Sequence, residues 1–576
     1  MICHTKLATV FFVGATLSLL GADDYAPGPD SKPQADVPKG EITQHTFAIG
    51  TNYPGTTREY WVYVPKQYDG SKPAPVMIFQ DGIIYNAPVV FDNLINKHEI
   101  PPLIGIFVMP GRVKANTTNA LDRFNRSYEY DGLGDTYARF LLDELLPHIV
   151  SDQKLNLSAN PNDHAIAGSS SGGICAFTAA WERPNAFRRV FTSVGTYVGL
   201  RGGNIYPTLI RKTEPKPIRI FLQDGSHDQD IYGGNWFLSN QDMLSALEFA
   251  GYDVNHNWGD GGHNGKHATA IFPDVLRWLW RDYPAPIVAN AEKKSRQPLM
   301  DILIPGEEWQ VAGQGFKFTE GPAVNSKGEV FFTDIPANRI HKIGLDGRIS
   351  VFKEDSGRAN GLMFGPNGKL YSCQTGKKRI VAYDAAGNEE TVAEGLDSND
   401  LAVAHNGNIY ISDPGSRTVW LVDAARKKRA VDVGIPRPNG LRLSPDQSLL
   451  YVADTGYQFV YSFHIEPDGS LTNKQKFFYL HFANDSVDSQ ADGMAVDNRG
   501  WLYVTSELGV QVCDPAGRVE GIILKPQNRW LSNVVFGGAN FDTLYVTCGD
   551  KVFKRKTKVT GVRSADAPIK PPAPRL

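Results

Sequence analysis

The stretch Gly168-Ser169-Ser170-Ser171-Gly172 decides the fold of the first half of the chain. It fits the pattern G-x-S-x-G, follows a strand-like run at residues 164–167 and precedes a helix-like run at residues 174–181. A strand, a sharp turn with glycines and a helix together raise a serine hydroxyl above the edge of a sheet. Gly and Ser alone are also typical of flexible loops, so the flanking elements carry the interpretation. Ser170 is the predicted nucleophile, and Ser169 and Ser171 are the alternatives.

The sequence around this turn alternates short apolar runs with helical segments up to about residue 290. The apolar runs include residues 76–79 and 218–222, and the helical segments include residues 137–150 and 240–250. Strands that alternate with helices predict a doubly wound, mostly parallel sheet with both faces covered. The first half is therefore expected to have an α/β fold with Ser170 at one edge of its sheet.

A serine hydroxyl needs a base to take its proton and a carboxylate to orient that base. In this kind of sheet the acid follows the serine along the chain, and the histidine comes last. Asp228 follows a glycine turn after the next buried strand, and His263 lies on a glycine-rich loop before the final helix. Order and placement favour this pair. The alternatives are Asp224 or Asp230 for the acid and His267 or His227 for the base.

Ester hydrolysis through an acyl-enzyme also needs N–H groups that stabilise charge on the carbonyl oxygen. One is expected from the backbone of Ser171, the residue after the nucleophile. The other is expected from the loop after the strand at residues 76–79, at Gly82 or Ile83. No cofactor is expected in this half of the chain.

The second half of the chain repeats one phrase. From about residue 300 helical segments nearly vanish, and Gly, Asn, Asp and Pro punctuate short alternating strands. A repeat of about 40 residues is typical of propeller blades. The six copies, which predict six blades, are Glu320-Gly-Pro-Ala-Val, Asn360-Gly-Leu-Met-Phe, Asn399-Asp-Leu-Ala-Val, Asn439-Gly-Leu-Arg-Leu, Asp492-Gly-Met-Ala-Val and Ser532-Asn-Val-Val-Phe.

The first residue of every copy carries a side-chain oxygen. Because the innermost strands line the central channel of a propeller, these residues are expected to form a ring around its axis. Carboxylate and amide oxygens suit a hard divalent cation, with Ca²⁺ first and Zn²⁺, Mg²⁺ or Mn²⁺ as alternatives. Asn and Asp also favour tight turns before strands, which is the competing interpretation at each single position. The ring consists of Glu320, Asn360, Asn399, Asn439, Asp492 and Ser532.

The bulk composition is that of an ordinary globular protein. A chain of 576 residues predicts two domains, and a formal net charge of −3 gives no reason to expect nucleic acid or an anionic membrane as a partner. No segment is apolar for long enough to predict a membrane span. The cysteines lack the spacing of a zinc site or a disulfide scaffold, so buried free thiols are favoured and one bridge stays open. They are Cys175, Cys373, Cys513 and Cys548.

The start of the chain is typical of an export signal. Lys6 closes a short n-region, residues 7–20 are apolar, and small residues follow, so residues 1–22 predict a secreted or periplasmic protein. The other predicted segments are a Pro-rich linker at 23–41, the α/β domain at 42–283, a second linker at 284–304, the propeller at 305–558 and a disordered Pro-rich tail at 559–576.

Several segments of the first domain match a known family. They are Tyr60-Trp-Val-Tyr-Val-Pro, Met77-Ile-Phe-Gln-Asp-Gly, Asp143-Glu-Leu-Leu-Pro, Ala167-Gly-Ser-Ser-Ser-Gly-Gly, Asp224-Gly-Ser-His-Asp and Gly261-Gly-His. On these, residues 42–283 resemble the esterase D, enterobactin esterase and feruloyl esterase group of α/β hydrolases. The resemblance implies hydrolysis of carboxylic esters, with Ser170, Asp228 and His263 at the triad positions. It leaves the acyl group open, because members act on siderophore, aryl and sugar esters.

The propeller segments Phe318-Thr-Glu-Gly-Pro, Ser398-Asn-Asp-Leu, Pro438-Asn-Gly-Leu and Ala491-Asp-Gly-Met are similar to those of the SMP-30/gluconolactonase family. The resemblance implies that Glu320, Asn439 and Asp492 ligate a metal and that Asp492 is the candidate general base. Asn399 and Asn360 would bind substrate or lie beside the metal. An arginine that some members place shortly before Asn399 is absent here, so specificity for sugar lactones does not follow.

Together these patterns predict an exported, bifunctional hydrolase of small-molecule esters or lactones derived from carbohydrates. A serine esterase would be joined to a metal-dependent, lactonase-type propeller. The first alternative is one active esterase whose propeller is a non-catalytic, metal-stabilised binding module. The second is a binding protein in which both sites are degenerate.

Overall fold

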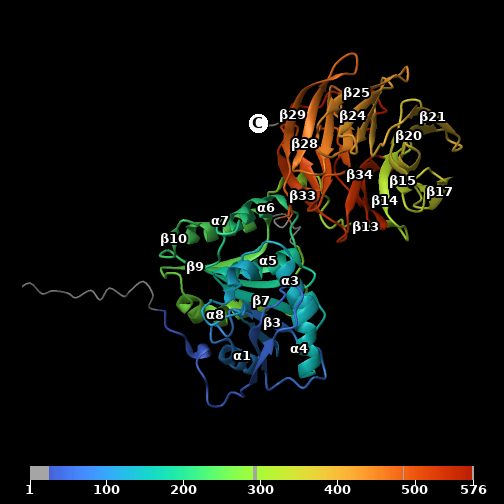
Figure 1. Ribbon diagram of the computed structural model, residues 1–576. Coiled ribbons are helices and arrows are strands. Elements are labelled where there is room, and N and C mark those ends of the chain that lie inside the picture. Colours follow the sequence, from blue (N-terminus) through green and yellow to red (C-terminus); the bar gives the residue numbers. More distant parts are fainter. Residues whose placement is uncertain (1–24, 290–294, 484–485, 574–576) are drawn as a thin grey trace, which may run out of the picture.

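The computed structural model describes residues 25–289, 295–483 and 486–573. Figure 1 shows two bodies, an α/β domain built from the first half of the chain and a propeller built from the second. The predicted export signal at residues 1–22 lies outside the described residues. In the described part of the chain, no helix is both long and apolar enough to span a lipid bilayer.

The α/β domain is built on an eight-stranded sheet with the order β1-β2-β4-β3-β7-β8-β9-β12. The pairs β1–β2 and β2–β4 are antiparallel, and the others are parallel. This is the mostly parallel, doubly wound sheet that the sequence predicts. The strands are β1 (Glu41–Phe47), β2 (Arg58–Val64), β3 (Val76–Gln80), β4 (Ile104–Val108), β7 (His164–Ser169), β8 (Arg189–Ser193), β9 (Arg219–Gly225) and β12 (Asp253–Gly259).

Helices cover both faces of this sheet because successive side chains of each strand point to opposite faces. In β3, Val76 and Ile78 pack into one apolar core, and Met77 and Phe79 pack into the other. The first core includes α4, α5 and α7, and the second includes α1 and α8. The helices are α1 (Ala87–Asn96), α2 (Arg126–Tyr130), α3 (Thr136–Arg139), a π-helix (Phe140–Leu145), α4 (Leu146–Gln153), α5 (Ser171–Glu182), α6 (Tyr206–Lys212), α7 (Trp236–Ala250) and α8 (Lys266–Trp280).

Short hairpins β5–β6 (Arg112–Val113, Arg123–Phe124) and β10–β11 (Asp230–Ile231, Gly234–Asn235) project from this domain. The cysteines that the sequence analysis considered, Cys175, Cys373, Cys513 and Cys548, are all free and buried. They act as small apolar side chains in the cores of the two domains.

The second half forms six four-stranded antiparallel sheets, which confirms the six predicted blades. In chain order the first three are β14–β17 (Thr319–Val324, Val330–Asp334, Arg339–Ile343, Ile349–Glu354), β18–β21 (Ala359–Phe364, Leu370–Gln374, Arg379–Tyr383, Glu389–Glu394) and β22–β25 (Leu401–Val403, Ile409–Asp413, Thr418–Val422, Lys428–Val433). The next two are β26–β29 (Pro438–Leu443, Leu449–Asp454, Phe459–Ile465, Leu471–Tyr479) and β30–β33 (Met494–Val496, Leu502–Ser506, Gly509–Cys513, Val519–Leu524).

The sixth blade closes the ring with strands from both ends of the propeller. Its inner strands are β34 (Leu531–Gly537), β35 (Thr543–Cys548) and β36 (Lys551–Lys556), and its outermost strand is β13 (Gln310–Gln314). Because β13 precedes the first blade in sequence, its pairing with β36 joins the two ends of the propeller by backbone hydrogen bonds. Pairing of this kind leaves no open edge between the first and last blades.

The glycine in the repeated phrase is explained by close approach of neighbouring blades. A Cβ atom on Gly440 would lie 2.2 Å from the backbone oxygen of Asp492, and one on Gly493 would lie 1.8 Å from Cγ of Asn533. No side chain fits at these distances, so the crowding of inner strands near the axis requires glycine.

The Pro-rich tail follows a defined path as far as residue 573, which differs from the disorder that its composition predicts. Val562 N–H donates to Val496 O at 3.0 Å, and Ile569 N–H donates to Pro445 O at 2.9 Å. Residues 562–565 line a cavity at the propeller axis together with Met363 and Arg442. The blades supply the hydrogen-bond partners that an isolated Pro-rich segment lacks, and this fixes the tail across the propeller.

The two domains meet where α6 approaches β33 (Figure 1). Glu214, just after α6, accepts two hydrogen bonds from the Arg555 guanidinium, at 2.7 and 3.0 Å. The side chains of Glu214 and Arg555 are only 16% and 5% exposed. Glu214 N–H also donates to Ile522 O at 2.9 Å, which adds a backbone link between the domains. A buried, bidentate ion pair of this kind fixes the orientation of the two domains.

Glu214→Ala is expected to weaken the contact between the domains. Removing one partner of a buried pair leaves Arg555 uncompensated and costs about 3 kcal/mol or more. In differential scanning calorimetry, the first unfolding transition should move down by roughly 5 °C or more. The matched control is Glu354→Ala, which removes the exposed pair with Arg339 and should cost less than about 1 kcal/mol. Equal shifts in the two variants would contradict the assigned role.

Candidate active sites

Ser170 occupies a strained turn between β7 and α5. Its φ of 60° and ψ of −123° lie outside the regions that residues with a side chain favour. A Cβ on Gly168 would lie 2.1 Å from Gly172 O, so the turn closes only with glycine at that position. Ser170 N–H donates to Ser193 O on β8 at 2.9 Å, which holds the turn against the sheet. This is the geometry that the G-x-S-x-G pattern predicts.

The structure brings Ser170, His263 and Asp228 together from three separate loops. His263 Nδ1 lies 2.6 Å from Asp228 Oδ1, and His263 Nε2 lies 2.8 Å from Ser170 Oγ. Because a carboxylate can only accept, Nδ1 carries the proton and Nε2 is free to accept from the serine hydroxyl. The rings of Trp236 and His263 are nearly perpendicular, with 5.7 Å between their centroids. Nucleophile, base and orienting carboxylate are thus within hydrogen-bond reach.

The alternative bases and the alternative acid Asp230 have other surroundings. His267 Nδ1 bonds Gln223 Nε2 at 3.0 Å, and its ring stacks on Tyr25 at 4.1 Å. His227 Nδ1 donates to a backbone carbonyl at 2.6 Å. Asp230 lies on β10 and is exposed. None of the three has a hydrogen bond with Ser170 or His263 in the described part of the chain.

Asp224, the other alternative acid, is fully buried beneath the triad. Its Oδ1 accepts from Gly225 N–H at 2.7 Å and its Oδ2 from Asn240 Nδ2 at 2.8 Å. Burial, and then a hydrogen bond with Asp228, raise the pKa of Asp224 to about 9. At neutral pH this carboxyl is therefore protonated, and it supports Asp228 from below instead of replacing it.

Asp224→Asn is expected to flatten the dependence of stability on alkaline pH. Asp224 is protonated when folded and ionised when unfolded, so its contribution to stability is complete below pH 3.8 and is lost as pH rises to about 9. Asparagine cannot ionise and keeps the size of the side chain. In urea unfolding, the free energy of unfolding of the variant should therefore rise relative to that of the unmodified chain as the pH increases from 5 to 9. If the free energies of unfolding of the two chains change in parallel over that pH range, Asp224 is not protonated in the folded state.

The expected oxyanion N–H groups differ in availability. Ser171 is the first residue of α5, so its N–H has no acceptor within the helix. Gly82 N–H donates to Val108 O at 3.3 Å, which engages it within the fold. Ile83, the next residue, is 43% exposed, and its N–H has no hydrogen-bond acceptor among the described residues. Of the two predicted positions on this loop, the geometry favours Ile83 over Gly82.

Arg126 is a site residue that sequence analysis did not identify. Its guanidinium donates to both carboxylate oxygens of Asp81, each at 2.8 Å, and to Ser169 O at 3.3 Å. It therefore ties the oxyanion loop to the nucleophile turn. The Tyr130 hydroxyl lies 3.3 Å from Asp81 N and supports the same loop. No local pattern marks Arg126, because its partners lie far away in the sequence.

In the propeller, Glu320, Asn439 and Asp492 are buried near one another. The charge of Asp492 acts on Glu320, and Asn439 lies within hydrogen-bond reach of Asp492. Asn439 Nδ2 donates to Thr455 Oγ1 at 2.9 Å, while its buried Oδ1 has no partner among the described residues. The amide is thus oriented by its nitrogen and has an oxygen available for a ligand.

The remaining ring positions agree only in part with the sequence-based expectation. Asn360 and Asn399 are half-buried, and Asn360 Oδ1 has no partner in the described residues. Ser532 does not face Glu320, because its hydroxyl donates to Thr319 O at 2.8 Å. Asn533 takes that place, and its Nδ2 lies 3.2 Å from Glu320 Oε2. Equivalent bulges occur in the first, second and fourth blades, so Ser532 keeps the predicted register position, but the side chain that reaches Glu320 is that of the next residue, Asn533.

This group of side chains fits a hard cation. Burial raises the pKa of Glu320 well above its usual range and that of Asp492 to about 7, with neighbouring carboxylates adding to the rise. Two converging carboxylates and the free amide oxygen of Asn439 are ligands that calcium prefers. The described residues contain no metal-binding cluster of three or more His, Cys, Asp or Glu side chains. The predicted set has only two such groups, and its third ligand is an amide.

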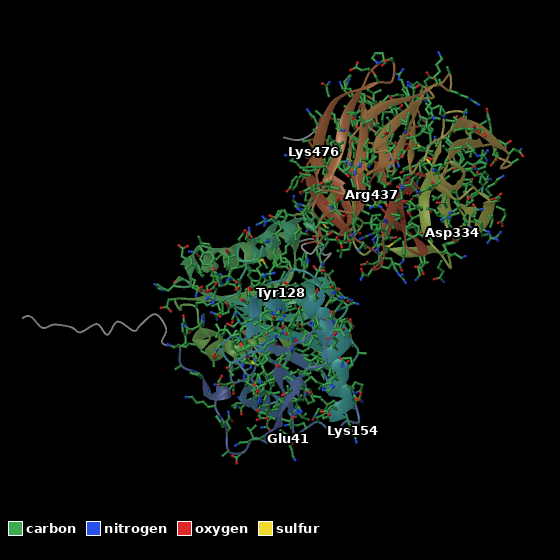
Figure 2. All side chains as sticks on the ribbon, viewed as in Figure 1. Glu41, Tyr128, Lys154, Asp334, Arg437 and Lys476 are labelled. Carbon is green, nitrogen blue, oxygen red and sulfur yellow. The ribbon has the colours of Figure 1, made fainter. Side chains whose placement is uncertain are left out.

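Four further residues near this group were not identified from sequence. Trp530 Nε1 donates to Asp492 Oδ2 at 2.8 Å and orients that carboxylate. Asp400 is buried 3.4 Å from Asn533 Nδ2, and burial raises its pKa to about 6, although the charge of buried Arg442 opposes the rise. The exposed Arg437, labelled in Figure 2, partly opposes by its charge the rise that burial causes in the pKa of Asp492. Asp400 directly follows the ring residue Asn399 in the third copy of the repeat, where the other copies have glycine or asparagine. This aspartate could have been recognised from the sequence.

Two family models match the chain in separate regions. The family described as "Putative esterase" matches residues 51–270, and the SMP-30/Gluconolactonase/LRE-like region matches residues 318–550. The first region contains the Ser170 triad, and the second contains the carboxylate and amide group of the propeller.

Related proteins divide in the same way. The gluconolactonase of Zymomonas mobilis is 26% identical over 303 residues, which are 46% of this chain and 84% of that protein. The iron(III) enterobactin esterase of Dickeya dadantii is 24% identical over 242 residues, 38% of this chain and 51% of its own length. A solved gluconolactonase of Xanthomonas campestris is 25% identical with a TM-score of 0.41, covering 45% of this chain and 92% of that one. The chain is a hydrolase that joins an esterase-family α/β domain to an SMP-30/gluconolactonase-type propeller.

Proposed function

We propose that this chain is an exported, bifunctional hydrolase with a serine esterase site and a separate, metal-dependent lactonase site. The observation that carries the proposal is the hydrogen-bonded set Ser170, His263 and Asp228, at 2.8 and 2.6 Å. The propeller group of Glu320, Asn439 and Asp492 supports the second activity. Small esters and lactones derived from carbohydrates are the proposed substrates, and residues 1–22 support export.

In the esterase site, Ser170 Oγ attacks the ester carbonyl while His263 Nε2 takes its proton. Asp228 holds the imidazole in the required tautomer and stabilises its charged form. The N–H groups of Ser171 and Ile83 would donate to the oxyanion of the tetrahedral intermediate. His263 then returns the proton to the leaving alcohol, and water releases the acyl group by the same steps.

In the propeller site, Glu320, Asn439 and Asp492 would hold the divalent cation, with calcium favoured by the oxygen ligands. When bound, the cation supplies Lewis-acid polarisation of a lactone carbonyl. Asp492, which Trp530 orients, would accept a proton from the attacking water. Asn360 and Asn399 would contact the substrate from the neighbouring blades.

Crossed inhibition of the unmodified chain tests the proposal. A fluorophosphonate should abolish hydrolysis of 4-nitrophenyl acetate and leave hydrolysis of an aldonolactone unchanged, because it modifies only an activated serine. EDTA should have the opposite effect. If neither the fluorophosphonate nor EDTA abolishes an activity, the proposal is contradicted. If the chain hydrolyses no lactone even after calcium is added, the propeller is a binding module and not a lactonase.

A further inference from the structure

The loop between β8 and α6 lies beside the nucleophile and continues to Arg201. Thr196 N–H donates to Ser170 O at 3.2 Å, and the Thr196 and Ser170 hydroxyls are 3.4 Å apart. Farther along, Gly199 N–H donates to Gly233 O at 2.7 Å, so the loop also contacts the hairpin β10–β11. Arg201 follows directly on this contact and is exposed.

The guanidinium of Arg201 is positioned on the other side by α2. It stacks over the ring of Tyr128, labelled in Figure 2, at 5.7 Å from the centroid. Its charge also acts on buried Asp131, which lies within hydrogen-bond reach of Ser171. The ring contact with Tyr128 and the charge interaction with Asp131 therefore both place this cation on the side of the site where Ser171 lies. Stacking on a tyrosine restricts the side chain and prepares it for a planar, anionic partner.

The charge of Arg201 is available to a ligand. Arg126, the other arginine near the turn, is engaged by both oxygens of Asp81. Among the described residues, Arg201 forms no ion pair within 4.0 Å. Asp131 is only 2% exposed and accepts from Ser127 Oγ at 2.6 Å, so it lies beneath the surface on which Arg201 is exposed.

Large apolar side chains are exposed on the segments that flank the triad. Ile83 lies on the oxyanion loop, Tyr232 lies on the hairpin after Asp228, and Leu238 follows Trp236, whose ring contacts His263. Their exposed fractions are 43%, 93% and 62%. Such side chains offer contact to the carbon skeleton of a substrate, while Arg201 offers one cationic contact.

We propose that the esterase site selects esters that carry a carboxylate and that Arg201 is the specificity-determining residue that binds this group. The inference rests on the proposed esterase function and adds its substrate class. A guanidinium donates two parallel hydrogen bonds to a carboxylate, which a neutral ester of the same length cannot accept. The planar geometry also explains why arginine suits the position better than lysine.

The test compares matched charged and neutral esters. With the carboxylate on the acyl side, the pair is 4-nitrophenyl hydrogen glutarate and 4-nitrophenyl pentanoate. With the carboxylate on the alcohol side, the pair is 4-acetoxybenzoate and 4-acetoxybenzamide. Arg201→Gln should raise KM for the charged member of one pair by about 10-fold or more and change the neutral member by less than about two-fold. Arg201→Lys should restore part of the difference, and added salt should reduce it.

The matched control is Arg211→Gln on α6, because Arg211 stacks on Phe249 and bonds Ser245. This variant should leave both members of each pair unchanged. Equal effects of Arg201→Gln on charged and neutral esters, or no preference for either charged ester in the unmodified chain, would overturn the inference.

Binding separates this inference from the proposed function. Calorimetric titration of Ser170→Ala with 4-nitrophenyl hydrogen glutarate and 4-acetoxybenzoate reports affinity without turnover. If one of these two esters binds to Ser170→Ala but not to the double variant with Arg201→Gln, the result supports the carboxylate site even if no ester is hydrolysed. Binding of neither, in a chain that hydrolyses neutral esters, would overturn the carboxylate site alone.

Discussion

Replacing His263 with alanine is expected to lower the turnover of 4-nitrophenyl acetate by about 10⁴-fold or more, because no other base reaches Ser170. His263 Nε2 is 2.8 Å from Ser170 Oγ, and its Nδ1 is fixed by Asp228 at 2.6 Å. KM should change little, since the imidazole acts mainly on the transition state and not on the bound ester. Steady-state kinetics at neutral pH measure both parameters.

The matched control is His227→Ala. His227 was an alternative base by sequence, but its Nδ1 donates to the Asp260 backbone oxygen at 2.6 Å. Turnover should therefore stay within about two-fold of the unmodified chain. A loss in His227→Ala as large as that in His263→Ala would contradict the assigned triad.

Asp492→Ala is expected to weaken calcium binding by about 100-fold or more and to abolish lactone hydrolysis. The change removes one of two carboxylates in the proposed ligand set, whereas loss of an outer-shell partner alone typically costs 10- to roughly 100-fold in affinity. Because Trp530 Nε1 donates to Asp492 Oδ2 at 2.8 Å, a bound cation should alter tryptophan fluorescence. Fluorescence titration with calcium thus reports occupancy without turnover.

Two controls accompany this titration. Asp346→Ala removes an exposed aspartate from a turn of the first blade and should leave the affinity unchanged. Trp530→Phe should retain calcium binding by calorimetry but lose most of the fluorescence change. An Asp492→Ala chain that binds calcium with unaltered affinity would remove Asp492 from the ligand set.

The parts of the structure that the sequence predicted correctly are those encoded by neighbouring residues. The turn at Ser170 needs glycines within a few positions, and the blade phrase recurs with its own glycine, so both patterns are local. The triad partners Asp228 and His263 could also be predicted, because each follows a strand whose carboxyl end must lie at the same edge of the sheet.

The parts that sequence analysis missed depend on contacts between distant segments. Arg126 joins Asp81 to the nucleophile turn, and neither its spacing nor its flanking residues mark that role. At the ring, Asn533 reaches Glu320 while the hydroxyl of its neighbour Ser532 donates to Thr319 O, and both contacts join strands that are far apart in the sequence. The Pro-rich tail was expected to be disordered because its partners lie on blades earlier in the chain.

The central claim is that one chain contains two independent hydrolytic sites. The most direct measurement is the hydrolysis of 4-nitrophenyl acetate and of an aldonolactone by the same preparation of Ser170→Ala, with calcium present. The account predicts that ester hydrolysis falls to background while the lactone is hydrolysed at the full rate of the unmodified chain. Loss of both activities together, or an unchanged rate with the ester, would contradict it.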